Sequence, residues 1–157
     1  MRQRDLLSAA VLAMGLALGA LREFLFTNLN YQLDFLRRGQ RGSNYAHSAF
    51  QRWAESIDLQ SLLVLKWAAA AGFVAAMLGL TLVLARLRMG SHRLARVIIA
   101  VFAGAALLAL ACHWAAPVFP GLGPVSIDLL HALQYPLPLL VVWAGSWLAA
   151  GGGTQRR

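Results

Sequence analysis

The side chains best able to carry chemistry are ionisable or polar groups placed just inside the ends of long apolar runs. They are Arg22, Glu23, His113, Asp128, His131, Gln134 and Tyr135. An ionisable group at membrane depth is costly, so such residues usually face the interior of a helix bundle and mark functional sites. We therefore take these seven residues as a candidate polar or ligand-binding cluster.

The spacing within the last apolar run favours a shared face. Asp128, His131 and Tyr135 follow one another at i, i+3 and i+7, which places them on one stripe of a helix. Gln134 flanks this stripe. The rise per residue places His113 and His131 at comparable depth beneath the outer surface of the membrane. We expect polar groups from three helices to meet there.

Three interpretations of the candidate cluster stay open. Arg22 can pair with Asp128, which gives a self-satisfied polar plug that fixes the helix register. The same groups suit a ligand, substrate or proton site. A metal or haem site is the third interpretation, but His113 and His131 supply only two nitrogens, so His47 or a carboxylate has to complete the ligand shell.

No catalytic motif accompanies these residues. The sequence has no phosphate-cradling glycine loop, no HExxH, no GxSxG and no paired carboxylates. Cys112 is the only cysteine, which excludes an internal disulfide and paired-thiol redox chemistry. Its neighbours are apolar, so we expect a buried, inert thiol. The sequence therefore leans towards a non-enzymatic protein, and no resident cofactor or metal is predicted.

The elements that must position these residues are membrane-spanning helices. Apolar residues make up 59% of the chain and charged residues only 13%, which is too little charge to coat a water-facing surface. About 20 helical residues cross a hydrocarbon core of roughly 30 Å. Four stretches qualify: residues 6–26, 62–85, 94–118 and 125–149. We predict an all-α polytopic protein, a four-transmembrane-helix bundle in a single membrane domain over residues 1–157.

The first of these stretches also fits a secretory signal peptide. Arg2 and Arg4 precede an apolar run that contains the small residues Ala17 and Gly19. The run is long for such a peptide, and residues 24–26 continue the hydrophobicity beyond any cleavage point. We therefore expect a retained helix.

The positions of the arginines predict the orientation of the spans. The two ends of the chain and the connection between the second and third spans fall on one side of a four-span protein. They carry Arg2, Arg4, Arg86, Arg88, Arg93, Arg96, Arg156 and Arg157. Asp5 is the one acidic residue among them. Both termini are therefore expected in the cytoplasm, in what the composition suggests is a bacterial inner membrane.

The net charge of +8 raises the question of nucleic acid. Nucleic-acid binding needs basic residues gathered on one soluble face and interleaved with aromatic residues, whereas the arginines here flank apolar runs. We expect no nucleic-acid partner. The expected partners are the lipid bilayer and other membrane proteins or further copies of the chain.

Small residues and prolines predict how the spans pack. Small residues four apart let the backbones of membrane helices approach closely, and Gly15 and Gly19 have this spacing in the first span. The second and third spans offer Ala71, Ala75, Gly79, Ala100 and Gly104. In the fourth span, Pro136 and Pro138 remove backbone donors, which predicts a kink near residues 133–136.

The extracytoplasmic connection over residues 28–61 is long for a helix bundle. Leu29, Leu33 and Leu36 form one apolar stripe, and a second stripe follows the breaker at residues 39–42, with Ser43 or Asn44 as its cap. Amphipathic helices in this position lie along the membrane surface, either as an interfacial lid or as a docking surface for a partner. The candidate partner surface comprises Asn28, Asn30, Tyr31, Tyr45, His47 and Trp53.

These features leave three functions open. The first is a small accessory protein or subunit of an envelope complex, which contacts its partners through the outer loop and the helices. The second is a small membrane enzyme or binding protein that acts on a lipid or quinone-like ligand at the candidate polar cluster. The third is an oligomeric transporter whose copies pool their polar residues.

Overall fold

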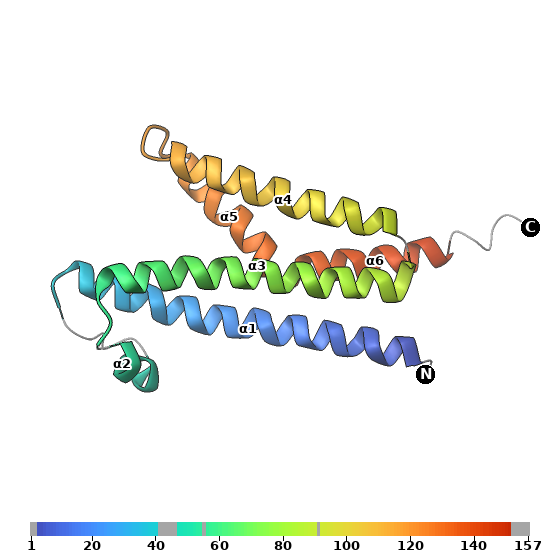
Figure 1. The fold of residues 1–157 in the computed structure, drawn as a ribbon, viewed down its shortest axis with the longest axis horizontal. Helices are drawn as coiled ribbons and strands as arrows, with labels where there is room; N and C mark the ends of the chain where they lie inside the picture. The colour runs from blue at the N-terminus through green and yellow to red at the C-terminus, as the bar shows by residue number, and fades with distance from the viewer. Residues whose placement is uncertain (1–2, 41–46, 55, 91, 152–157) are drawn as a thin grey trace, which may run out of the picture. The chain divides into compact units, whose positions relative to one another are not determined.

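The fold is known from a computed structural model that describes residues 3–40, 47–54, 56–90 and 92–151. All regular structure in these residues is helical (Figure 1). The helices are α1 (Gln3–Arg37), α2 (Ser48–Ala54), α3 (Leu59–Met89), α4 (His92–Ala115), α5 (Leu122–Gln134) and α6 (Leu137–Gly151). The all-α class predicted from the sequence is confirmed.

Among the described residues, three helices are long and apolar enough to cross a membrane. They are α1, α3 and the Leu94–Ala115 part of α4. The α5 and α6 helices pass the same test only as a pair, because they are bent by 57° at the break between them. The chain therefore has three candidate membrane spans, or four if the bent pair is one span.

The α1 helix is longer than the first predicted span. It runs unbroken from Gln3 to Arg37, so the stripe expected to begin a separate surface helix at Leu29 continues the first span instead. Nothing in residues 27–37 breaks a helix, since they contain neither glycine nor proline. The helix ends at Gly39, whose φ of 71° is left-handed. The Gly39 N–H bonds Leu36 O and the Gln40 N–H bonds Phe35 O, which is a Schellman motif.

The break between α5 and α6 falls where the two prolines predict it. Tyr135 is extended, with φ −87° and ψ 162°, and its N–H makes the last bond of α5, to His131 O at 2.9 Å. Pro136 and Pro138 have no N–H to continue the ladder. The bond from the Leu140 N–H to Pro136 O, at 3.1 Å, belongs to the new helix. The predicted kink is confirmed as a complete interruption of the helix.

The chain divides into two compact units, and each has its own apolar core. Unit 1 consists of Met1–Gly19 and Val74–Arg157, and unit 2 consists of Ala20–Phe73. The buried core of unit 1 is Met77, Leu84, Ala85, Ile98, Phe102, Leu133 and Leu139. The buried core of unit 2 is Leu29, Leu33, Phe50, Ala54 and Leu62.

In unit 1, the α5–α6 pair runs back along the length of α4. At one end, the Ser126 hydroxyl of α5 donates to Ala109 O of α4, at 2.8 Å. At the other end, a Cβ on Gly145 of α6 would lie 4.0 Å from Met89 Cε, at the end of α3. Figure 1 shows α5 leaving the turn after α4 and α6 continuing towards the end of α3. The pair therefore crosses unit 1 from end to end.

The glycines of α1 make room for the break in this pair. A Cβ added to Gly15 would overlap the side chain of Leu139, and one added to Gly19 would lie 3.1 Å from Pro136 Cδ. The close packing predicted for these two glycines is therefore confirmed. Gly79 and Gly104 differ, because nothing lies within 4 Å of the position that the Cβ of either would take.

Candidate functional site

The residues of the candidate polar cluster fall into two groups that belong to different units. Arg22 and Glu23 belong to unit 2, and the other five residues belong to unit 1. In unit 1, Gln134 is buried, His131 is half-buried, and both His113 and Asp128 are exposed. The cluster of seven therefore stays a prediction, and each group is described in its own unit.

The register of α4 against α5 separates the two histidines of unit 1. The bond between Ser126 and Ala109 pairs these antiparallel helices at that level, so His131 lies level with about Gly104. His113 is then about nine residues away along α4, or roughly 13 Å. His131 packs instead on Tyr135, with ring centroids 6.0 Å apart at 82°.

A metal site finds no support in the described part of the chain. No group of three histidine, cysteine, aspartate or glutamate side chains in residues 3–40, 47–54, 56–90 and 92–151 could hold a metal ion. The low-ranked candidate ligands His113, His131 and His47 therefore do not form such a group. His47 belongs to unit 2, where its ring and backbone contact α1 and α2.

Arg22 is the most buried charged residue of the candidate cluster. Its side chain is 5% exposed, and its Nη1 lies 3.1 Å from Oε2 of Glu23, which is itself exposed. The guanidinium carbon also lies 4.9 Å from the centroid of the Phe26 ring. Arg22 is thus held against its own helix by a carboxylate and an aromatic face, an arrangement that lowers the cost of burying the charge.

Asn28 fastens α2 to α1 in unit 2. It is buried, its Nδ2 donates to Phe24 O at 2.7 Å, and its Oδ1 accepts from the His47 N–H at 2.7 Å. The His47 ring rests edge-on against Phe24, with centroids 5.8 Å apart. Asn28 was predicted on the partner surface, yet its amide is used inside unit 2.

His47 also caps the start of α2. Its Nδ1 accepts from the Ala49 N–H at 3.3 Å, and its backbone O accepts from the Gln51 N–H at 2.9 Å. The helix begins at Ser48, so the cap is not one of the residues predicted for it. Ser43 and Asn44 lie outside the described residues, as does Tyr45 of the candidate partner surface.

The remaining partner-surface residues differ in how they are used. Asn30 accepts a 2.7 Å hydrogen bond from Lys66 Nζ of α3 through its Oδ1. Tyr31 is exposed, and Trp53 is 50% exposed while its ring contacts the buried Phe50, with centroids 5.3 Å apart. Trp53 therefore presents an indole on the surface of unit 2 that is oriented from beneath by the core.

Asp58 begins α3. Its Oδ2 accepts from the Gln60 N–H at 3.0 Å and from the Ser61 N–H at 3.2 Å, which satisfies two donors of the first turn. Hydrogen bonds from the Ser61 side chain and from the backbone lower the pKa of this carboxyl below its usual range. The charged form of Asp58 therefore caps the start of α3.

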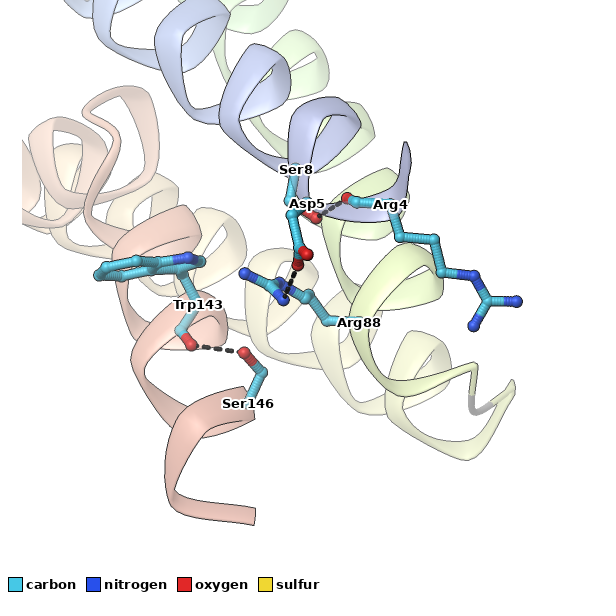
Figure 2. A network of polar contacts seen from close by, with 6 residues as sticks. All are labelled: Arg4, Asp5, Ser8, Arg88, Trp143 and Ser146. Carbon is cyan, nitrogen blue, oxygen red and sulfur yellow. Dashed lines mark hydrogen bonds and ion pairs between the residues drawn. The ribbon is translucent and has the colours of Figure 1, made fainter. Parts of the chain in front are cut away.

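An ion pair in unit 1 was not predicted from the sequence. Arg88 Nη1 of α3 lies 3.0 Å from Asp5 Oδ1 of α1 (Figure 2). Its guanidinium carbon is 5.7 Å from the centroid of the Trp147 ring of α6. The available signal was that Asp5 is the one acidic residue among the eight arginines of the predicted cytoplasmic segments.

Comparison with protein-family models, with curated proteins and with solved structures gives no match to this chain.

Proposed function

We propose that the chain is a four-span accessory subunit of an envelope complex in a bacterial inner membrane. Both termini lie in the cytoplasm, and residues 28–61 lie on the other side, where they contact a partner protein. The path of the α5–α6 pair supports four spans. It starts beside the end of α4 and finishes beside the end of α3, so it behaves as one broken crossing and not as a loop that returns to its own side.

The lengths of α1 and α3 support an extracytoplasmic position for residues 28–61. At 1.5 Å per residue these helices of 35 and 31 residues measure about 52 and 46 Å, against a hydrocarbon core of roughly 30 Å. Their basic ends meet at the Asp5–Arg88 pair, which marks one boundary of the bilayer. About 20 residues further on, near Leu25 and Ala68, each helix reaches the other boundary. The excess length therefore falls in unit 2.

The observation that carries the proposal is the way unit 2 holds Trp53 at its surface. A short turn is enough to join two spans, so a third helix is not needed for the connection. Here α2 is packed on a separate core, is fastened by Asn28 and His47, and ends with a half-exposed indole. Tryptophan with a rigid support is the residue type most enriched at the energetic centres of protein interfaces. We assign the partner contact to the surface around Trp53 and Tyr31.

A second function is favoured by the burial of Arg22 in unit 2. Buried polar side chains at membrane depth suit a headgroup or a quinone-like ring that enters from the bilayer. In this alternative the chain is a small binding protein or enzyme, and the Trp53 surface is dispensable for its activity.

A pull-down in mild detergent followed by mass spectrometry of proteins and small molecules tests the two functions. We expect a membrane or periplasmic protein to be recovered with the wild type and lost with Trp53→Ala. Trp114→Ala is the matched control, because it removes an exposed indole of unit 1 and should retain the partner. A protein recovered equally with both variants would contradict the proposal. So would a co-purifying lipid or quinone that is lost with Arg22→Gln and not with Trp53→Ala.

A further inference from the structure

The guanidinium of Arg88 offers more hydrogen-bonding capacity than its protein partner uses. Asp5 contacts Nη1, and Figure 2 shows the side chain lying between Asp5 of α1 and Trp143 of α6. Nε is buried and has no hydrogen-bond partner. A buried donor without a partner is uncommon in a native protein and calls for an explanation.

The geometry of the guanidinium indicates what would satisfy this donor. The Nε–H and one N–H of Nη2 point the same way and form a fork, which matches two oxygens of a carboxylate or a phosphate. Asp5 takes the opposite side of the group, at Nη1, and holds the guanidinium in place. The Arg88 side chain is 21% exposed while Nε itself is covered, so an oxyanion that approaches from outside the bundle reaches the fork by displacing the atoms over Nε.

The residues around Arg88 are of the types found at the level of lipid headgroups. Trp147 is exposed and lies at the same end of unit 1, with its ring against the guanidinium and against Trp143. Indole rings at the end of a membrane helix sit at the level of the headgroups. The exposed arginines at the ends of α1, α3 and α4 make this end strongly positive. They are Arg4, Arg86 and Arg96.

We propose that Arg88 is a binding site for the phosphodiester of an anionic phospholipid, held between the end of α3 and the tryptophans of α6. This inference does not depend on the partner contact assigned to unit 2. The positive-inside rule requires only charge at this end, whereas the site proposed here requires the fork of one particular arginine.

Native mass spectrometry of the full-length protein, released from micelles with phosphatidylglycerol or phosphatidylcholine, tests the site. The wild type should retain phosphatidylglycerol in preference to phosphatidylcholine. Arg88→Lys keeps the charge and the possibility of pairing with Asp5 but loses the fork, so it should weaken phosphatidylglycerol retention about tenfold. Arg86→Gln is the matched control: it removes a whole charge from the same helix end and should keep retention within about twofold of the wild type.

Asp5→Asn separates a lipid site from a purely structural ion pair. The variant keeps an oxygen that can accept from Nη1 and removes a negative charge near the phosphodiester, so phosphatidylglycerol retention should equal or exceed that of the wild type. Equal losses for Asp5→Asn and Arg88→Lys would overturn the proposal in favour of a structural pair. Equal losses for Arg86→Gln and Arg88→Lys would overturn it in favour of diffuse surface charge. Displacement of the lipid by soluble inorganic phosphate would show that the site takes phosphate and not lipid.

Discussion

The two units differ in how their hydroxyl and amide side chains are bonded. In unit 1, buried or half-buried hydroxyls of the spans mostly bond a carbonyl one turn back in their own helix. They are Ser8 on Arg4 O, Thr81 on Met77 O and Ser146 on Trp143 O. Such bonds satisfy the hydroxyl within its own helix and do not link one helix to another. The Ser126–Ala109 bond joins two helices of unit 1. Close packing joins others, as where the side chain of Leu139 fills the space left by Gly15.

In unit 2 two amide side chains take part in bonds between elements that are distant in sequence. Asn28 bonds a residue 19 positions away, and Lys66 bonds Asn30 across 36 positions. The apolar core of unit 2 lies between these fastenings. In the proposed topology, the difference follows from the solvent. Burial of apolar surface stabilises a unit in water, whereas lipid tails are as apolar as leucine, so helices in the bilayer depend on close packing.

The largest expected effect comes from emptying the core of unit 2. Leu29 and Leu139 are both fully buried, one in each unit. Leu29→Ala should lower the free energy of unfolding by about 3–4 kcal/mol, since it loses transfer from water as well as packing. Leu139→Ala should cost about half as much, because only packing and cavity terms apply in lipid. Equilibrium unfolding in bicelles measures both free energies. Equal losses would contradict the claim that the two cores are stabilised differently.

Filling the glycine face of α1 should have the next largest effect. Gly15→Leu forces its side chain against Leu139 and should destabilise unit 1 by about 1–3 kcal/mol. Gly79→Leu makes the same change where nothing lies within 4 Å of the added Cβ, so its stability should stay close to that of the wild type. Thermal unfolding in detergent gives the two values. Similar losses at both positions would mean that Gly15 is not a packing contact.

The fastening of α2 predicts a smaller and local effect. Asn28→Ala removes both the acceptor for the His47 N–H and the bond to Phe24 O. It should raise hydrogen exchange across α2 by a factor that corresponds to about 1–2 kcal/mol. Thr81→Val, which removes a hydroxyl bonded only within its own helix, serves as the control. Unchanged exchange in α2 for the Asn28 variant would show that Asn28 does not fasten α2 to α1.

Acidification should give the smallest effect. The pKa of Asp58 is lowered in the folded protein by its bonds to Ser61 and Gln60. The stability that it contributes is therefore present above its unfolded pKa and is lost as the pH falls through the folded value. Amide exchange at the start of α3 should speed up relative to the intrinsic rate as the pH falls below about 4. Asp58→Asn should remove that pH dependence, and a persisting pH dependence in the variant would assign it to another group.

Local signals account for the part of this fold that the sequence could predict. The apolar runs indicated the helices, Pro136 and Pro138 the break between α5 and α6, and Gly39 the end of α1. The break and the helix end each depend on the backbone chemistry of one or two residues, and the apolar runs are local in sequence. None of these signals needs tertiary information. The close packing of α1 was likewise visible in the spacing of Gly15 and Gly19.

The remainder depends on tertiary register, which one sequence does not carry. The polarity of Asn28 suggested a residue exposed on a loop, whereas it is buried because His47 returns to meet it. Hydropathy likewise suggested an end to the first helix after Phe26. Hydropathy indicates whether a segment prefers lipid or water, and it does not indicate where a helix ends. Residues 27–37 contain no glycine or proline, so the helix continues through them. The Asp5–Arg88 pair joins residues 83 positions apart and has no local signal beyond their charges.

The break at the prolines also bears on how the protein enters the membrane during synthesis. The 13 residues of α5 and the 15 residues of α6 measure about 20 and 22 Å, so neither half alone bridges the hydrocarbon. In the four-span topology, the insertion machinery has to hold α5 until α6 emerges from the ribosome and completes the crossing. A nascent chain stalled soon after Gln134 would therefore have only three helices integrated.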